Sequence, residues 1–433
     1  MEPETCNLKR FPGVESQVED PNLKPETLNL KIASRETLHA SRTQTWRARV
    51  RVLALLLLTV SACSCAIIAI QPPPNVPVRA GVHSATRANF TIGERERRDG
   101  MFIGLALSGG GSRATAFSTA VMLELQRLGL LEQVDVLSGV SGGGLAATAY
   151  ALDGYEGLSF NADTLTRVAQ DFQGAWVRAW FSPRNLLRYA FTDVTRSDTL
   201  IEVLDEALFH GATYADLNPS RPKLLLNTTN TSTGEAFVIS DERFAELHSS
   251  LAEFGLARAV YLSAAYPDVL RPMTLQSYAS SAHTPEVPGT PGPTLYDGGP
   301  VDNLGLLTLV EVLHTATRNE PVESVFPHGC LVMSVDATPR LPHQDKTPLP
   351  ASTVLLNSHR RAVLAQLGIP SALQDRASFG TFSVGTGSCL FWHLALRQLP
   401  ADGLSGWLRM GFFLVSAVAL VGLAMQFRRF AGA

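Results

Sequence analysis

A short stretch in the first third of the chain constrains the fold more than any other. Residues 134–138 predict a strand, residues 145–152 predict a helix, and the pentapeptide Gly-Val-Ser-Gly-Gly at 139–143 joins them. A G-x-S-x-G sequence in this setting is typical of a strained strand-to-helix turn, which pushes the serine hydroxyl out of the sheet. The pentapeptide alone arises often by chance, but its position predicts that Ser141 is a nucleophile. The glycines expected to support the turn are Gly139 and Gly143.

A second glycine-rich turn lies earlier in the chain. The apolar run 103–107 predicts a strand, and residues 114–128 predict a helix with an apolar stripe. The intervening Ser-Gly-Gly-Gly-Ser-Arg places bare N–H groups at a helix N-terminus, which favours the binding of an anion. A generic turn is the alternative, while a nucleotide-binding P-loop would need a Gly-Lys-Ser/Thr ending that is missing here. The candidate anion donors are Gly109, Gly110 and Gly111, with Arg113 supporting the loop.

The third candidate is Asp297, in the sequence Tyr-Asp-Gly-Gly at 296–299. It follows a Pro- and Gly-rich stretch, 282–294, that we expect to be a surface loop. A serine hydroxyl is a poor nucleophile until a base accepts its proton. Asp297 can be that base if burial raises the pKa of its carboxyl group, and Gly298 and Gly299 let the backbone approach the serine. An Asp-Gly-Gly sequence is by default only a tight turn.

Strands and helices alternate over a single domain, 98–395. This alternation favours an α/β fold, a three-layer α/β/α sandwich with a mostly parallel central sheet. A second Pro-rich stretch, 339–350, follows a strand-like run, and there is no internal repeat. At 433 residues the chain is long enough for one large domain with appendages or for two modest domains.

Taken in order, the three segments resemble the patatin-like phospholipase family, which carries a glycine-rich oxyanion loop, a G-x-S-x-G elbow and an Asp-Gly-Gly base. The likeness extends to residues 224–229 with Gly234, which look like the family's central strand and turn. Residues 263–267 are similar to its small-residue helix ending in proline, and Asn303 lies where the family often has an asparagine. Ala114 departs from the pattern, since the family commonly has glycine there.

The resemblance covers roughly residues 100–340 and implies a patatin-like sandwich. It implies that Ser141 is the nucleophile and Asp297 its sole partner, a dyad rather than a triad, and that the glycine loop holds the oxyanion. It also implies a lipid acyl hydrolase that acts on a phospholipid or another acyl-ester lipid and needs no metal or organic cofactor. Arg113 is expected to steady the loop, and contact with a phosphate headgroup is the alternative.

Two rival interpretations stay open. One is an α/β-hydrolase-like esterase, in which His314, His328 or His343 completes a Ser-Asp-His triad, although none of these lies in a recognisable motif. The other is a non-catalytic lipid-binding envelope scaffold. A scaffold has no need of Ser141 and Asp297 together.

The N-terminal region combines an unpatterned leader with an apolar run. Residues 1–46 show no persistent period and are expected to be disordered. Residues 47–71 begin with arginines and continue as an uncharged run long enough to span a bilayer. We favour a lipoprotein signal in which Cys63 of the lipobox-like Val-Ser-Ala-Cys is lipidated. The alternatives are an uncleaved transmembrane anchor and a buried core helix. The long leader fits a lipoprotein only if Met1 is not the true start.

The C-terminal segment 404–427 predicts an apolar helix followed by two arginines, either a transmembrane segment or a packed or amphipathic helix. A membrane is therefore an expected partner, with the catalytic domain exported, on the periplasmic side in a bacterium. Within the domain, residues 176–191 hold aromatic side chains and three arginines. They predict either a lipid-contacting surface or a partly buried cap over the site.

Composition agrees with a membrane protein and argues against a nucleic-acid partner. Hydrophobic residues make up 45% of the chain and charged residues 17%, below the roughly 25% charged of an average globular chain. A net charge of −3 gives no electrostatic reason to bind nucleic acid. The five cysteines lack the spacing of a zinc site. Cys330 and Cys389 are expected to be free core cysteines, with a disulfide as the alternative in an oxidising compartment. The oligomeric state is left open.

Overall fold

The computed structural model divides the chain into two units, Met1–Ile70 and Gln71–Ala433, and the described residues all belong to the second. The leader 1–46, the segment 47–71 with Cys63, the segment 404–427 and His343 lie outside the described residues. Among the residues that are described, no helix is long and apolar enough to cross a membrane. The described residues are 73–79, 85–267, 269–279, 289–318, 320–338, 358, 362, 363, 365, 378–384 and 387–396.

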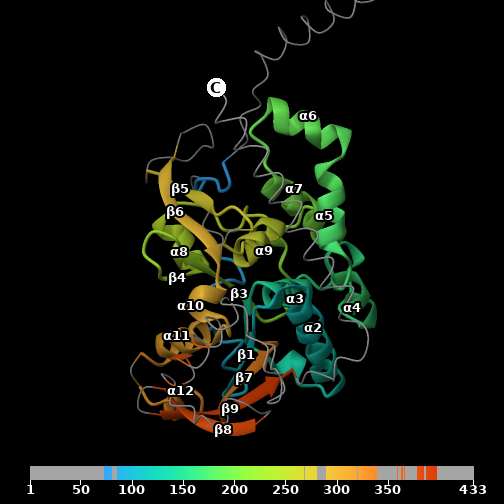
Figure 1. Ribbon diagram of the computed structural model, residues 1–433. Helices are drawn as coiled ribbons and strands as arrows, with labels where there is room; N and C mark the ends of the chain where they lie inside the picture. Colours follow the sequence, from blue (N-terminus) through green and yellow to red (C-terminus); the bar gives the residue numbers. More distant parts are fainter. Residues whose placement is uncertain are drawn as a thin grey trace, which may run out of the picture. The chain divides into compact units, whose positions relative to one another are not determined.

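One mixed sheet organises the domain (Figure 1). Its strands follow the order β5-β6-β3-β2-β1-β7-β9-β8, and β4 also pairs with β3. The central pairs, from β3 through β2, β1 and β7 to β9, are parallel, whereas the pairs that involve β4, β5, β6 or β8 are antiparallel. The strands are β1 (Met101–Leu107), β2 (Val136–Val140), β3 (Lys223–Asn230), β4 (Ala236–Ile239), β5 (Met273–Ser277), β6 (Thr290–Asp297), β7 (Gly329–Asp336), β8 (Ser378–Val384) and β9 (Gly387–Ala395).

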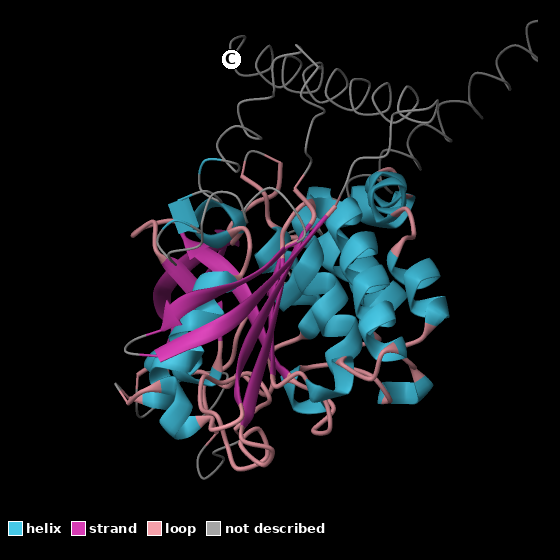
Figure 2. Ribbon diagram, turned by 90° about the horizontal axis from the view of Figure 1, so that it is seen from below, coloured by secondary structure: helices cyan, strands magenta, loops and turns pink. Residues whose placement is uncertain are grey.

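Helices cover both faces of the sheet (Figure 2). The α-helices are α2 (Gly111–Arg127), α3 (Gly142–Ala151), α4 (Ala162–Val168), α5 (Phe172–Trp180), α6 (Pro183–Phe191), α7 (Arg196–Leu204), α8 (Asp241–Glu246), α9 (Leu256–Ala264), α10 (Gly299–Asp302), α11 (Leu306–Thr317) and α12 (Val322–Val325). Single turns of 3-10 helix lie at Leu131–Gln133, Tyr155–Gly157 and Tyr214–Asp216, and a π turn lies at Asp205–Phe209. This arrangement confirms the predicted α/β/α sandwich with a mostly parallel central sheet.

The central strand β1 explains why the sheet is covered on both faces. Its residues Ile103, Leu105 and Leu107 belong to the core that includes α2, α3 and α9, while Phe102 and Ala106 belong to the core that includes α11. Successive side chains of a strand point to opposite faces, so a strand that is apolar throughout needs cover on both of them. The continuous apolar run in the sequence is therefore the cause of the three layers.

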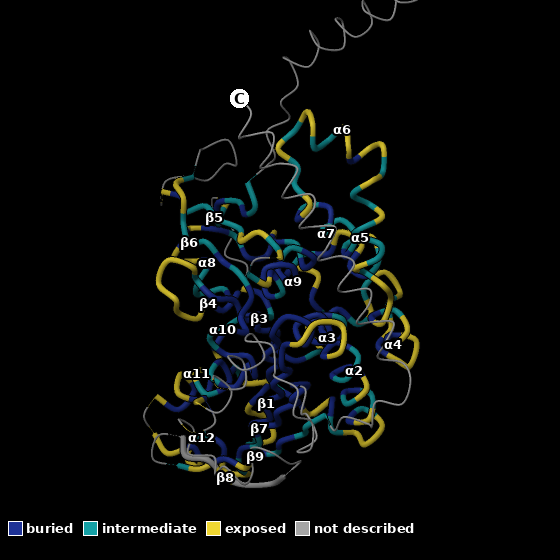
Figure 3. The backbone as a smooth tube through the Cα atoms, viewed as in Figure 1, coloured by how far each residue is buried: buried dark blue, intermediate teal, exposed yellow. Residues whose placement is uncertain are grey.

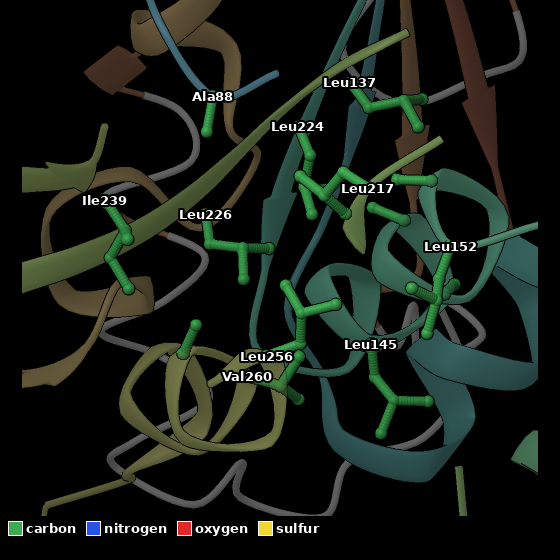
Figure 4. Close-up of a cluster of buried hydrophobic side chains, with 14 of the residues drawn as sticks. Ala88, Leu137, Leu145, Leu152, Leu217, Leu224, Leu226, Ile239, Leu256 and Val260 are labelled. Atoms are coloured by element: carbon green, nitrogen blue, oxygen red, sulfur yellow. The ribbon is translucent and has the colours of Figure 1, made fainter. Parts of the chain in front are cut away.

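The larger core lies between the sheet and the pair α3 and α9. Figure 4 shows Leu224 and Leu226 of β3 beside Leu145 of α3 and Leu256 of α9. Strand β3 is buried along most of its length (Figure 3). Because burying one leucine side chain contributes roughly 1.5–3 kcal/mol, this layer fixes the position of the two helices against the sheet.

Two predicted boundaries differ from the structure. The domain extends upstream of residue 98, because Phe90 and Ile92 are buried in the core beside α11. The prediction that residues 282–294 form a loop is partly wrong, because β6 begins at Thr290. Its prolines are tolerated since the pairing of β6 with β3 begins only at Leu295, so the proline part pairs with β5 alone.

Cys330 and Cys389 form a disulfide, with their Cα atoms 4.8 Å apart. The expectation of two free core cysteines is therefore wrong. The cause is a contact between strands distant in sequence: β7 and β9 are parallel neighbours, and Leu331 pairs with Leu390. The 59-residue separation hides this contact from any local pattern.

Reduction of this disulfide should destabilise the domain. Closing a loop of 59 residues is expected to contribute about 4 kcal/mol through the entropy of the unfolded chain. The urea midpoint of unfolding should therefore fall when a reductant is added. The double variant Cys330→Ala/Cys389→Ala is the control, and its midpoint should not respond to reductant. An unchanged midpoint for the parent protein would contradict the prediction.

Candidate active site

Ser141 occupies the turn between β2 and α3, and its backbone is strained. Its φ of 51° and ψ of −120° lie in a region that residues other than glycine rarely adopt. β2 ends at Val140 and α3 begins at Gly142, so a single residue makes the transition. The predicted sequence of strand, sharp turn and helix is present at this point.

The glycines around the turn allow strand and helix to cross closely. A Cβ atom on Gly139 would lie 2.6 Å from the Cα of Gly144, and one on Gly143 would lie 2.4 Å from the carbonyl oxygen of Leu107. Both approaches are with backbone atoms, which cannot move aside as a flexible side chain would. Gly139 and Gly143 therefore have the structural role predicted for them.

Two buried polar residues hold the strained turn in place. The Ser141 N–H donates to the hydroxyl oxygen of Ser263 at 2.9 Å, and that hydroxyl donates to the carbonyl oxygen of Asn227 at 2.8 Å. The Asn227 side-chain amide donates to the Ser138 hydroxyl at 2.9 Å and to the Gly139 carbonyl at 3.0 Å. Sequence reasoning gave neither residue a role. The available signal was that Ser263 lies inside an apolar run and Asn227 directly follows one, where burial requires hydrogen-bond partners.

Strand β3 brings Asp297 to Ser141. Val140, the last residue of β2, pairs with Asn227, and Asp297, the last residue of β6, pairs with the next residue, Thr228. Since β4 pairs with Thr228 as well, β6 must lie on the other edge of β3, the edge that β2 also uses. The ends of β2 and β6 therefore meet at consecutive positions of one strand edge.

The carboxyl group of Asp297 lies in a buried position, with 5% of the residue exposed. It accepts a hydrogen bond from the Gly299 N–H at 2.7 Å, and the Ser141 hydroxyl lies near enough to interact with it. Burial raises the pKa of this carboxyl from its ordinary 3.8 to about 6, against the lowering effect of the Gly299 N–H and the Ser141 hydroxyl. A Cβ on Gly298 would lie 2.5 Å from the Asn227 carbonyl oxygen, so that glycine permits the close approach. At neutral pH the group is mainly ionised and able to accept a proton.

The glycine loop packs against the same turn, but it offers fewer free donors than predicted. The position of a Cβ on Gly109 is 3.5 Å from the Cβ of Ser141. However, the Gly109 N–H donates to the carbonyl oxygen of Asn303 at 2.9 Å. Gly109 is therefore not the free oxyanion donor that the sequence predicted, but holds the loop in place. Gly111 begins α2 and Gly110 precedes it. The first N–H groups of a helix have no acceptor within the helix, and Gly110 and Gly111 remain the candidate donors.

Arg113 connects the glycine loop to the chain that follows β7. Its Nε donates to the carbonyl oxygen of Ala337 at 3.0 Å. This contact is of the kind expected if Arg113 steadies the loop. The neighbouring Ala114, where the resemblance led us to expect glycine, is fully buried, and its Cβ lies 3.3 Å from the position of a Cβ on Gly110.

His314 and His328, two of the three histidines proposed for a triad, do not meet Asp297. His328 precedes Gly329 at the amino end of β7, whereas Ser141 follows the carboxyl end of β2, and β2, β1 and β7 run parallel. His314 is an exposed residue in the second half of α11. A further histidine, His393, is buried on β9, which is separated from β2 by β1 and β7.

Comparison with known proteins gives a family match within this domain. Residues 105–310 match the family model described as patatin-like phospholipase. No curated protein matches the chain.

Within the described part of the chain, no group of three or more His, Cys, Asp or Glu residues is placed to hold a metal ion.

Several solved structures are similar to this chain. Human GIVD cytosolic phospholipase A2 shares 15% identity at a TM-score of 0.43, over 71% of this chain and 52% of that one. The complex of full-length SpcU with full-length ExoU from Pseudomonas aeruginosa shows 20% identity, a TM-score of 0.25 and 38% coverage of both chains. VipD from Legionella pneumophila shows 13% identity, a TM-score of 0.27, and coverage of 70% and 63%. The chain spans about half the length of the human phospholipase. None of these likenesses bears on the chemistry of the site.

The Ser263 hydroxyl should be needed to position Ser141. Ser263→Ala removes the acceptor of the Ser141 N–H, so the turn should relax and covalent labelling of Ser141 by a fluorophosphonate should slow about tenfold or more. Ser334→Ala is the matched control. Ser334 is a buried serine on β7, and its hydroxyl has no hydrogen-bond partner in the described part of the chain. Equal labelling rates for the two variants would refute the positioning role.

Proposed function

We propose that this protein is a lipid acyl hydrolase that cleaves carboxylic esters through a Ser141–Asp297 dyad and an acyl-enzyme intermediate. The observation that carries the proposal is the buried Asp297 carboxyl group beside the hydroxyl of Ser141, at a strained turn. The family of residues 105–310 supports the reaction class. A carboxylate with a pKa of about 6 is a suitable proton acceptor near neutral pH.

In the first half of the reaction, the ester carbonyl oxygen lies against the N–H groups of Gly110 and Gly111. The Ser141 Oγ forms a bond to the carbonyl carbon while its proton passes to Asp297. The carbonyl oxygen takes up the negative charge, which these donors and the N-terminus of α2 stabilise. Each well-placed donor of this kind contributes roughly 3 kcal/mol.

Collapse of the oxyanion breaks the bond between the carbonyl carbon and the alcohol oxygen. The proton held by Asp297 passes to that oxygen, the alcohol leaves, and the acyl group stays on Ser141. In the second half, water gives a proton to Asp297 as its oxygen attacks the acyl carbon. The second oxyanion collapses, the Ser141 Oγ regains the proton from Asp297, and the fatty acid leaves. Asp297 is thus the base in each attack and the acid in each collapse.

We also propose that the substrate is a phospholipid or another acyl-ester lipid at a membrane, and that the domain is exported. The family name supports the substrate class. The Cys330–Cys389 disulfide supports export, because disulfides persist mainly in oxidising compartments. The apolar sequences within 47–71 and 404–427 support attachment to a membrane.

Loss of either dyad residue should abolish hydrolysis. Ser141→Ala removes the nucleophile and Asp297→Asn removes the base, so each should lower kcat by about three orders of magnitude or more. Hydrolysis of a short-chain p-nitrophenyl ester and of phospholipid vesicles gives the two readouts. The vesicle assay also distinguishes phospholipids from neutral esters.

Asp302→Asn is the matched control for Asp297→Asn. Asp302 is also buried with its pKa raised to about 6 by burial, but its carboxyl accepts hydrogen bonds from Gly305 and Leu307 at 3.0 and 2.8 Å. Its loss should lower activity far less than the loss of Asp297. Activity that survives Asp297→Asn and disappears with His343→Ala would favour a triad. A folded parent protein that resists fluorophosphonate and cleaves neither substrate would favour the scaffold.

Activity and stability should depend on pH in opposite directions. The rate should rise with pH and level off above about 6, since Asp297 must be ionised to accept the proton. Because folding raises the pKa of Asp297 from 3.8 to about 6, the folded state binds the proton more tightly than the unfolded state. The contribution of Asp297 to the free energy of unfolding therefore falls across this interval as pH rises.

Asp297→Asn tests the stability half of this argument. The amide keeps an acceptor for the Gly299 N–H but carries no charge, so the variant should be more stable than the parent by up to about 3 kcal/mol above the folded-state pKa. Thermal unfolding at pH 8 and pH 5 measures the effect, and the gain in Tm should be larger at pH 8. A variant that is less stable than the parent at pH 8 would show that burial of the charge is not destabilising.

A further inference from the structure

Helix α6 presents an unusual concentration of apolar side chains to solvent. Four of the eight large hydrophobic side chains that are exposed in the described part of the chain lie on α6 or immediately before it. Their exposed fractions are 66% for Phe181, 52% for Leu186, 60% for Leu187 and 45% for Phe191. Single exposed apolar residues are ordinary, but a contiguous group of them indicates an interaction surface.

The exposed apolar side chains of α6 share one face of the helix. Positions three, four, seven and eight residues apart lie on the same side of an α-helix. Pro183, Leu186, Leu187, Ala190 and Phe191 follow that spacing, and all five are exposed. Figure 1 shows α6 on the outer side of α5 and α7, and Figure 3 shows exposed residues along it.

The polar face of α6 is the one that contacts the protein. The Asn185 side-chain amide donates to the carbonyl oxygen of Ala179 at 3.0 Å. Arg188 donates to the Glu202 carboxylate at 2.7 Å, and the hydroxyl groups of Tyr189 and Thr199 are 2.6 Å apart. A surface helix of a globular protein ordinarily does the reverse and turns its apolar stripe to the core. The packing of α6 is therefore inverted.

The charges around this apolar face are complementary to an anionic surface. The segment 172–196 carries four arginines and one aspartate, although the whole chain has a net charge of −3. Arg178 and Arg184 are exposed on α5 and α6. Apolar residues with arginines beside them are typical of helices that lie in the interface of a bilayer, where the arginines meet anionic headgroups.

We propose that α6 docks on a bilayer that contains anionic phospholipids, with its apolar face at the acyl boundary and the arginines at the headgroups. The proposal rests on the proposed function, because a lipid hydrolase must work at the surface of its substrate. It also narrows the expectation for residues 176–191. Among the aromatic side chains of that segment, Trp176 and Trp180 are half-buried and pack edge to face, so the exposed residues of α6 form the surface.

Photo-crosslinking of the full chain in vesicles identifies what contacts α6. The photoreactive residue p-benzoylphenylalanine replaces Leu187 in one variant and Leu128, an exposed leucine at the end of α2, in the control. With vesicles of phosphatidylcholine and phosphatidylglycerol, the label at position 187 should form a lipid adduct and the label at 128 should not. Adducts at 187 with another part of this chain or with a second copy would overturn the proposal, as would equal lipid labelling at both positions.

Hydrolysis separates docking from chemistry. In Leu186→Ser/Leu187→Ser, the ratio of phospholipid-vesicle hydrolysis to soluble p-nitrophenyl ester hydrolysis should fall about tenfold, while Leu128→Ser should leave that ratio unchanged. An unchanged ratio in the double variant would overturn the docking role of α6. If the parent protein cleaves neither substrate, the proposed function fails, and the crosslinking result still decides whether α6 meets lipid.

Discussion

The site depends on the pairing of one strand edge. Asn227 of β3 pairs with the last residue of β2, its carbonyl oxygen accepts the Ser263 hydroxyl that holds the Ser141 N–H, and its side-chain amide contacts the residues before the turn. The next residue, Thr228, pairs with Asp297. Buried backbone groups must keep their partners, so β3 cannot slip without separating Ser141 from Asp297. The strand that aligns the sheet therefore also sets the spacing of the two proposed catalytic groups.

This arrangement places two unfavourable features at one point. The backbone of Ser141 lies in a region that costs roughly 1–3 kcal/mol for a residue other than glycine, and burial of Asp297 disfavours its charged form. Neither feature would persist on a loosely packed loop. Ser141 and Asp297 lie at the ends of strands β2 and β6, in a sheet whose apolar side chains fill a core on each face. The two cores stabilise the domain enough to hold a strained serine beside a buried carboxylate.

The sequence predicted the parts of the site that depend on local geometry. The turn at Ser141 and the glycine loop follow strands and open helices, so neighbouring residues suffice to indicate them. The engagement of the Gly109 N–H by Asn303 and the disulfide between β7 and β9 depend on contacts between distant residues, which no local pattern contains. Helix α6 shows a different limit. Its periodicity indicates an apolar face, but the same periodicity fits a face turned to the core or to solvent. Only the contacts of Asn185 and Arg188 reveal which side meets the protein.

An aspartate can replace the usual histidine only within a narrow range of pKa. At its ordinary value of 3.8 the carboxylate would hold the serine proton too weakly to assist attack, and a value well above neutrality would leave it protonated and without basicity. Burial moves the pKa upward, while the Gly299 N–H and the Ser141 hydroxyl hold it at about 6. The Gly299 N–H is available because the chain turns directly after β6, and Gly298 allows that turn to pass close to Asn227. The Asp-Gly-Gly sequence thus acts on the acidity of its own first residue as well as on the shape of the turn.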